Sequence, residues 1–553
     1  MNLKEIFKQP INIVFSVNLM LVFLIAFGIL PRQIAFLVMG FIIGFIIGFP
    51  IKQGVNLFLR SIPFFIALPI TENFDNFNIW RVVLLVIFLK WFFADFAYAK
   101  GVDAKSSTRR SFIRKRVSDW RVFVSGNWFD RTIAWVKTNQ IEFAGVMFFI
   151  FAALSLLVAP DVVVGIKRII FILNATMLFV VLRALVLKDK SNAISFIKNF
   201  AYSGLLAVGF GFLQFIAAYF VPAWIFHYWW GQVVSINMYG ARWGDIVTNF
   251  GNTWFSYSGD TLRLRMFSTF PDSHSFPMYV IMTLPSIVFL FIQRYKIKVL
   301  NFRVLVASYK FTPHLHAVKV RWLLITFSLI MLALVLTGTR GIWLAILPVL
   351  LSAGVFKLIK ISKKFVMVMV ILSLLFLSMF PLYFGIVSFR QFQDSDFTGA
   401  ASIQRIRSIV DFGETSNEAR VYIWKTTLKY IKKSPVFGIG IGNYPLILSE
   451  PQSAAMAGAS AHNLYLDIAA TMGIFALVVF LWMLWGVFVR GIKYLKYSKI
   501  DLYSIYVAVS LFSLIWIFAY LMTDAALFDG RALLAFMAVL GIMVPIINKK
   551  RSN

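Results

Sequence analysis

A histidine stands beside an apolar segment in a position where it can act as a base. His462 precedes Asn463 and opens an apolar run that continues to about Val489, which is long enough to cross a bilayer. The position predicts an imidazole at the membrane–water interface, at the start of a helix. The positive end of that helix should lower the pKa of His462 and leave a neutral ring that accepts a proton. The alternative is a plain helix start, capped by Ser460 or Asn463, in which the histidine is incidental.

Three arginines are candidates to accompany this histidine. Arg340 sits in a tight turn between two apolar segments, Arg420 lies in the first turn of a predicted amphipathic helix, and Arg265 ends a long loop. Guanidinium groups fit phosphate oxygens in a partly dry site, so together the arginines predict a phosphate-binding site. Two alternatives stay open. Arg340 can reach lipid phosphate from the membrane edge, and Arg265, with its neighbour Arg263, can be structural.

A glycine-rich segment, 437–444, follows the predicted amphipathic helix, which Ser434-Pro435 should end. Its alternating glycines would let backbone N–H groups approach an anion. A plain turn is the alternative, because the Lys-Ser/Thr pair of a nucleotide-binding loop does not follow. We assign a supporting role to Asn463, Gly440, Gly442 and Tyr444.

The elements that must position these residues are membrane helices. The chain has 553 residues, of which 60% are hydrophobic, and a mean hydropathy of +0.81. The apolar residues fall in blocks of about twenty. We therefore expect an all-α polytopic membrane protein with about 14 transmembrane helices and a partly helical extracytoplasmic loop region. The expected spans are 11–30, 33–50, 57–71, 79–98, 141–159, 162–186, 200–221, 276–293, 321–338, 342–358, 365–387, 463–489, 502–522 and 531–547.

The distribution of charge predicts the topology. The formal net charge is +31, and with fourteen spans the basic clusters all fall in alternate loops on the same side as both termini. The positive-inside rule places that side in the cytoplasm. Aromatic residues alternate with basic ones in the loop 100–140, which we interpret as an amphipathic segment on the inner leaflet and not as a nucleic-acid site. We expect membrane lipids as partners and no nucleic acid.

By elimination, the outer face carries two long loops, about 222–274 and 389–461, which hold Arg265 and Arg420 and lead up to His462. A diphosphate-binding arginine set with one base describes transfer from a lipid-diphosphate donor to a hydroxyl acceptor. No cluster of histidines and acids has metal-ligand spacing, so we expect no metal and no cofactor.

Residues 200–490 resemble the O-antigen ligase and polymerase superfamily, membrane glycosyltransferases that use undecaprenyl-diphosphate-linked sugars. The resemblance implies that His462 activates the acceptor and that Arg340 and Arg420 hold the donor diphosphate; Arg265 lies in a similar arginine-containing stretch. It also implies a glycan or lipid-glycan acceptor. The motifs that carry it are Thr337-Gly338-Thr339-Arg340-Gly341, Arg420 with Trp424, Pro435 followed by Gly438-x-Gly440-x-Gly442-Asn443-Tyr444, and His462-Asn463 with Gly473.

The chain accordingly divides into N-terminal transmembrane helices (1–199), a ligase-like catalytic membrane domain (200–490) and C-terminal transmembrane helices (491–553). We expect a metal-independent inverting glycosyltransferase in the cytoplasmic (inner) membrane, with its active site on the periplasmic face. Gly473 is followed by Ile474-Phe475 and not by the threonine pair of many ligases, so ligase and polymerase both stay open. The alternative function is a transporter or flippase of the same lipid-linked glycan, although the spans are poor in acids.

Overall fold

The computed structural model describes residues 9–70, 77–100, 136, 139–249, 254–258, 261–295, 315–389, 391–392, 415–448 and 460–548. Within these residues the chain is helical, apart from one antiparallel hairpin of β1 (Phe255–Ser258) and β2 (Thr261–Leu264) and an isolated bridge between Ala67 and Asn78. The all-α fold class is confirmed. The expected amphipathic segment within 100–140 lies almost entirely outside the described residues.

The described helices and short helical turns follow one another along the chain. In order they are α2 (Pro10–Ala26), η1 (Arg32–Ile34), α3 (Ala35–Gly48), α4 (Ile51–Ser61), η2 (Ile62–Phe64), α5 (Ile79–Lys100), α8 (Gln140–Leu154), η3 (Ser155–Val158), α9 (Val162–Lys188), α10 (Ser191–Ala217), α11 (Ala223–Tyr228), η4 (Trp229–Ser235), α12 (Ile236–Tyr239), α13 (Ala241–Asn249), α14 (Ser275–Tyr295), α16 (Leu315–Leu336), α17 (Arg340–Leu344), α18 (Ile346–Leu358), α19 (Lys363–Leu377), α20 (Phe380–Ser388), α22 (Thr415–Lys433), η5 (Tyr444–Ile447), α24 (Leu464–Met472), α25 (Ile474–Tyr497), α26 (Leu502–Tyr520), η6 (Ala526–Phe528) and α27 (Gly530–Asn548).

Among the described residues, nine helical segments are long and apolar enough to cross a membrane, and three shorter apolar helices accompany them. Eight of the nine coincide with expected spans, from 141–159 in the first half of the chain to 531–547 at its end, and the other, Ile474–Tyr497, overlaps only the second part of the expected span 463–489. The shorter three match the expected spans at 11–30, 33–50 and 321–338. The chain is therefore a multi-pass membrane protein.

The expected third span, 57–71, is not one helix. α4 has 11 residues, which is about 16 Å of helix and too short to cross the bilayer. Pro63 lies in the 3-10 turn that follows, where it cannot donate a backbone hydrogen bond. The chain then continues in extended form, and the Ala67 N–H donates to the Met238 carbonyl at 2.8 Å. This segment instead packs against the loop that contains α12.

The expected span 463–489 is divided into α24 and α25 at Gly473. This glycine has a φ of 86°, and a Cβ there would lie 1.9 Å from the Val436 carbonyl oxygen. The Ile474 N–H donates to the Pro435 carbonyl at 2.8 Å. A continuous helix is impossible here because the backbone at the start of the glycine-rich segment passes through the corner between the two helices.

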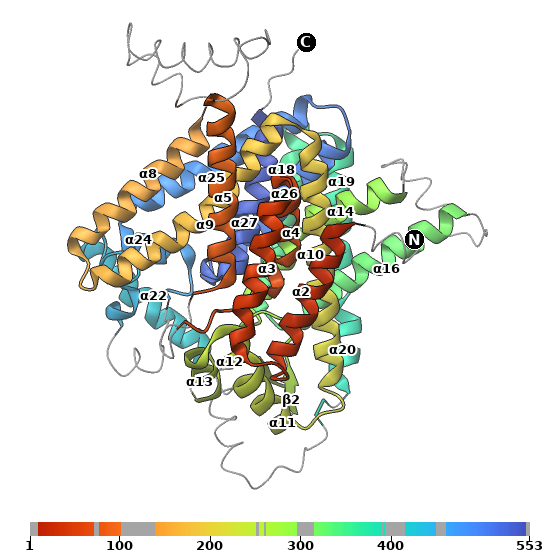
Figure 1. Ribbon diagram of the computed structural model, residues 1–553, viewed down its shortest axis with the longest axis vertical. Helices are drawn as coiled ribbons and strands as arrows, with labels where there is room; N and C mark the ends of the chain where they lie inside the picture. The colour runs from red at the N-terminus through yellow and green to blue at the C-terminus, as the bar shows by residue number, and fades with distance from the viewer. Residues whose placement is uncertain are drawn as a thin grey trace, which may run out of the picture.

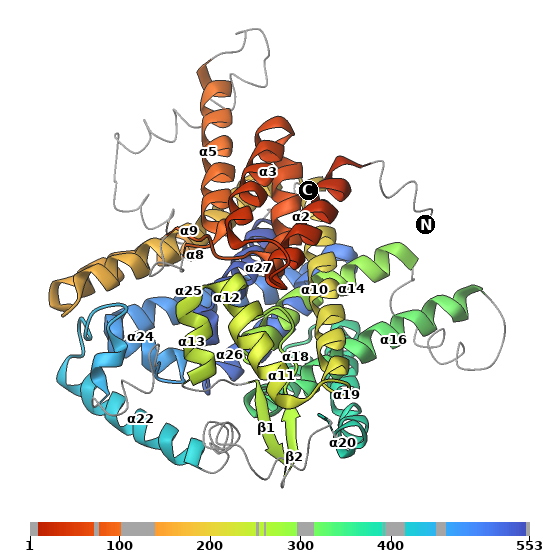
Figure 2. The same cartoon turned by 60° about the horizontal axis from the view of Figure 1, so that its bottom comes forward.

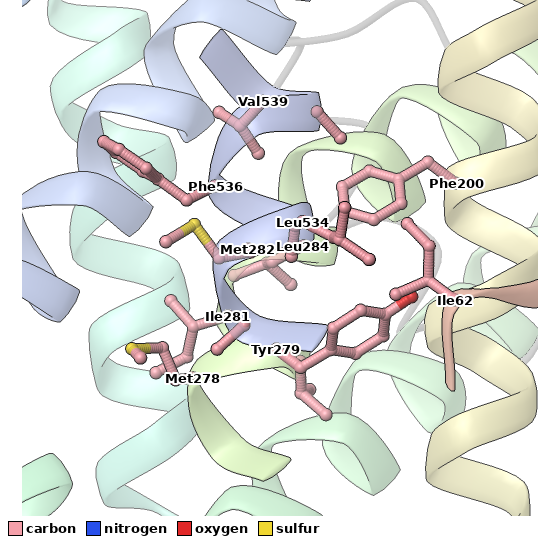
Figure 3. Packing of buried hydrophobic residues seen from close by; sticks show 14 of the residues in the cluster. Ile62, Phe200, Met278, Tyr279, Ile281, Met282, Leu284, Leu534, Phe536 and Val539 are labelled. Atoms are coloured by element: carbon pink, nitrogen blue, oxygen red, sulfur yellow. The ribbon is translucent and has the colours of Figure 1, made fainter. Parts of the chain in front are cut away.

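The centre of the molecule is α14. It packs against α10, α26 and α27, and Figure 3 shows its side chains meeting those of α10 and α27. The methionines of α14 fill gaps between branched and aromatic side chains. Because α14 starts at Ser275, this buried helix fixes the position of the residues just before it. The labelled core residues are Ile62, Phe200, Met278, Tyr279, Ile281, Met282, Leu284, Leu534, Phe536 and Val539.

The two long loops meet at one end of the molecule. Figure 1 shows α11, α12, α13 and the β-hairpin in its lower part, with α22 beside them. The turned view in Figure 2 keeps the same elements together. Elements of the two long loops therefore lie at the same end of the molecule.

Candidate active site

The loop before α14 and the turn between α16 and α17 are joined by hydrogen bonds. The Met266 N–H donates to the last carbonyl of α16 at 3.0 Å, and the Thr339 hydroxyl donates to the Ser273 carbonyl at 2.8 Å. Gly338 lies so close to Arg265 that a Cβ on the glycine would be 3.2 Å from the arginine Cγ. These contacts bring Arg265 next to the turn that carries Arg340.

The histidine segment is joined to the connection between α26 and α27. Asn463 is the N-cap of α24 and accepts from two N–H groups of its first turn. The Asn463 Nδ2 donates to the Met522 carbonyl at 2.9 Å. The Leu464 N–H donates to the carbonyls of Leu521 at 2.9 Å and Asp524 at 3.1 Å. The expected helix start is thus present, and it also fixes His462 relative to a distant loop.

α22 contacts the same segment through a tryptophan. The Trp424 Nε1–H donates to the Ala461 carbonyl at 2.9 Å. Arg420 lies one turn earlier on the same face of α22, because residues four apart on a helix are neighbours. An electrostatic interaction between Arg420 and His462 is consistent with this placement. The spacing of Arg420 and Trp424 therefore has a geometric reason.

His462 has the properties of a neutral base. Burial lowers its pKa from the ordinary histidine value, and the positive charge of Arg420 acts in the same direction, while Asp524 opposes both. The backbone φ of His462 is 44°, a left-handed conformation that costs about 1–2 kcal/mol in a residue with a Cβ. Such strain is common where a side chain is held for a function.

A carboxylate that the sequence did not single out lies between two histidines. Asp524 Oδ2 is 2.9 Å from His274 Nδ1, and Oδ1 accepts from the N–H groups of Ala525 at 2.7 Å and Ala526 at 2.9 Å. Burial alone would raise the pKa of Asp524, but its interactions with His274 and His462 hold the pKa below the usual range. Asp524 is therefore an ionised carboxylate that interacts electrostatically with the base.

The arginines form a cluster of like charge. Burial lowers the pKa of Arg265 to about 10, and the charges of Arg340 and Arg420 contribute to the shift. The buried Arg265 Nε has no hydrogen-bond partner in the described part of the chain, whereas Arg340 is exposed. Gathered cations with a buried unsatisfied donor are costly unless an anion is bound among them. The structure brings Arg265, Arg340 and Arg420 together, and it places His462 beside Arg420.

The glycine-rich segment packs elsewhere. Its N–H groups at Ile439, Gly440 and Ile441 donate to the Ala470 carbonyl, the Thr471 carbonyl and the Ser155 hydroxyl at 2.9, 3.0 and 3.1 Å. These donors are used within the protein and are not free to hold an anion.

Gly440 and Gly442 are required for packing, since both have positive φ, 98° and 84°. A Cβ on Gly440 would lie 2.4 Å from the Cβ of Ala159. The buried Tyr444 hydroxyl is hydrogen-bonded to Thr427 at 2.6 Å. Among the supporting residues, Gly440, Gly442 and Tyr444 thus hold α22 and α24 against the α8–α9 connection, and Asn463 is the one whose contacts lie at the histidine.

His274, Tyr520 and Asp524 were missed as site residues by sequence reasoning. Two signals could have found them: the chain has only 5 histidines, and Asp524 is an acid in a short connection on the expected outer face. In the described residues no three His, Asp or Glu side chains gather closely enough to hold a metal ion.

Fold and site together define a multi-pass helical membrane protein with a buried base and an arginine cluster at one end. Residues 325–481 match a family model described as O-Antigen ligase. No curated protein matches the chain. The match confirms the resemblance of this part of the chain to the O-antigen ligase and polymerase superfamily, a family of glycosyltransferase-like enzymes for which lipid-linked glycans are the implied substrates. Arg340, Arg420 and His462 lie inside the matched range, whereas Arg265, His274 and Asp524 lie outside it.

Proposed function

We propose that this protein transfers a glycan from an undecaprenyl-diphosphate-type carrier to a hydroxyl of an acceptor glycan at the outer face of the cytoplasmic membrane. The observation that carries the proposal is the juxtaposition of a neutral histidine, His462, with the cluster of Arg265, Arg340 and Arg420. The match of residues 325–481 to the O-antigen ligase family model supports the reaction class. The acceptor is a glycan or a lipid-linked glycan, and both ligase and polymerase activity fit it.

The reaction is a single displacement at the anomeric carbon. The acceptor hydroxyl attacks that carbon while its proton passes to the imidazole of His462. The bond from the anomeric carbon to the phosphate oxygen breaks, and its electron pair leaves with the lipid diphosphate. One displacement inverts the anomeric configuration, and no metal takes part.

The arginines stabilise the leaving group. Negative charge on the bridging oxygen grows as the glycosidic bond breaks, and preorganised cations in a water-poor site lower the energy of that state. The buried Arg265 Nε is a donor without a partner in the described residues, and a phosphate oxygen is a suitable acceptor for it. Arg340 is the first residue of α17, at the start of a span, so the lipid tail of the carrier can stay in the bilayer.

The proposal is tested with purified protein, a lipid-diphosphate-linked glycan and an acceptor glycan in detergent. His462→Ala should lower transfer by about 1,000-fold, since a positioned general base contributes that order of rate. Donor affinity should stay near the wild-type value because the arginines remain.

The matched control is His227→Ala, which removes a histidine in α11 outside the site and should leave transfer unchanged. Turnover near wild type in His462→Ala would exclude this base. Movement of the donor across sealed vesicles without any transfer product would favour a flippase.

A further inference from the structure

His274 is held rigidly at the start of the central helix. Asp272 caps α14: its Oδ1 accepts from the backbone N–H groups of His274 at 2.8 Å and Ser275 at 2.7 Å, and from the Ser275 hydroxyl at 2.8 Å. The helix that follows is buried among the other spans. The imidazole therefore projects from a fixed backbone and not from a loose loop.

The Nδ1 of His274 contacts two residues at the end of α26 and in the connection that follows it. It lies 2.9 Å from Asp524 Oδ2 and 3.0 Å from the Tyr520 hydroxyl. The side chains of His274 and Asp524 are 19% and 10% exposed, so little water competes for these contacts. An ionised carboxylate only accepts hydrogen bonds, so Nδ1 carries the hydrogen that is donated to Asp524.

Asp524 connects this histidine to the base. Its backbone carbonyl accepts from the Leu464 N–H at 3.1 Å, two residues after His462, and its carboxylate interacts electrostatically with the imidazole of His462. Carboxylates that face a catalytic histidine stabilise the imidazolium formed when that histidine takes a proton. The orientation of Asp524 thus matters for the reaction as well as for the fold.

We propose that His274 is a positioning residue for the proton-transfer step: its Nδ1–H holds the Asp524 carboxylate in the orientation that stabilises the imidazolium formed on His462. The inference rests on the function proposed above. It assigns no proton transfer to His274 itself; the acceptor proton goes to His462, and His274 keeps its own proton throughout.

Replacing His274 by asparagine distinguishes a positioning role of His274 from a role in proton transfer. In His274→Asn, the side-chain amide offers an N–H close to the place of Nδ1, but it has no counterpart of the distal ring nitrogen, Nε2, and does not titrate. His274→Ala removes both the N–H and the distal nitrogen. If His274 acts through its Nδ1–H, His274→Asn should retain the kcat that His274→Ala loses.

The variants should differ in kcat and not in donor binding. His274→Ala should lower kcat about 30-fold, while KM for the lipid-linked donor is unchanged. His274→Asn should lie within about threefold of wild type. In an Asp524→Asn background, which is itself impaired, His274→Ala should add less than about a twofold loss, because both act through one carboxylate.

Each contrary outcome has a meaning. Equal, severe losses in well-folded His274→Asn and His274→Ala overturn the inference and assign proton transfer to the distal nitrogen. The inference is also overturned if His274→Ala lowers kcat by the same factor in the Asp524→Asn background as in the wild type. Thermal unfolding and size-exclusion profiles are compared for every variant. If His274→Asn fails to fold, His274→Gln replaces it, and its longer amide should restore kcat in part; no recovery above His274→Ala refutes the inference.

Failure of the proposed function looks different. In that case the wild-type protein shows no transfer from the lipid-diphosphate donor, and His274→Ala and His462→Ala do not differ from it; the inference then falls with the function. An active wild type with an inactive His462→Ala, but with no rescue by His274→Asn, refutes the inference alone.

Discussion

At the scale of single residues, burial sets the charge state of each group at the site. Burial keeps His462 neutral and lowers the pKa of Arg265, whereas the contacts of Asp524 are strong enough to reverse the effect of burial on its carboxyl. The site therefore contains a base without its proton, a permanent carboxylate and a cluster of cations suited to an anion. This combination fits a reaction that creates an imidazolium and a leaving diphosphate together.

The first residue-scale prediction concerns pH. Because the pKa of His462 is lowered, the reactive neutral form persists below the ordinary histidine pKa of about 6.5. Activity is present above the shifted pKa and is lost as pH falls through it. A profile of kcat/KM against pH should thus have its acidic midpoint below about 6.5, since kcat/KM reports groups of the free enzyme. A midpoint above that value contradicts the assignment of His462.

The second residue-scale prediction concerns donor binding by Arg265. Arg265→Lys keeps a charge but loses the planar fork, so kcat/KM for the lipid-linked donor should fall about tenfold. For Arg265→Ala it should fall about 100-fold, equivalent to about 2.8 kcal/mol. Arg242→Ala removes an exposed arginine of α13 and is the matched control. A donor titration in which Arg265→Ala behaves like Arg242→Ala removes Arg265 from the diphosphate site.

At the scale of elements, the candidate catalytic histidine is placed by helix ends. α24 starts after Asn463, and α22 reaches the residue before His462 through Trp424. The backbone at Pro435 and Val436 occupies the corner at Gly473, and the glycine-rich segment that follows pairs with the end of α24. The motifs between Arg420 and Gly473 are therefore packed together, and only some of their residues can contact substrate.

The element-scale prediction compares two glycines. Gly473→Ala should destabilise the protein by more than about 1 kcal/mol, because the residue has a positive φ and its Cβ would lie 1.9 Å from the Val436 carbonyl oxygen. Gly354→Ala in α18 has open space around the new methyl group and should be neutral or slightly stabilising. Thermal unfolding in detergent measures both. Equal stability of the two variants would show that the corner at Gly473 is not closely packed.

At the scale of the whole molecule, the ends of many helices converge on one site. The starts of α14, α17 and α24, the ends of α16 and α26 and the connection between α26 and α27 carry its residues or their contacts. Along the last part of the chain, the end of one span and the start of the next lie at the same side of the molecule, as antiparallel spans require. The proposed outer location of the site then fixes the side of every other connection.

The topology prediction uses the absence of cysteine from the chain. Lys433→Cys, at the end of α22, should react with a membrane-impermeant thiol reagent applied from the outer side. Lys499→Cys, between α25 and α26, should react only after the membrane is permeabilised. The unmodified protein is the blank for both measurements. Reaction of Lys499→Cys from outside, with Lys433→Cys protected, would place the arginine cluster in the cytoplasm and exclude the proposed reaction.

Features that depend on neighbouring residues could be predicted from the sequence. Runs of apolar residues located the nine long segments found in the described part of the chain, because crossing a bilayer needs about twenty of them in succession. The end of α22 at Lys433 follows from Ser434-Pro435, and the cap at Asn463 follows from residue type. Arg340 and Arg420 are candidates because basic residues on the expected outer face go against the positive-inside bias, and His462 is a candidate because it opens an apolar run.

Only the tertiary structure decided which distant groups meet. His274 and Tyr520 are separated by 246 positions, and no local pattern links them; the packing of α14 against α26 brings them together. The partner of the Gly440 N–H is likewise set by tertiary packing: this group donates to a carbonyl of α24 and not to an anion. Hydropathy and helix signals act over a few turns of chain, whereas the partner of a buried polar group is set by how whole helices pack.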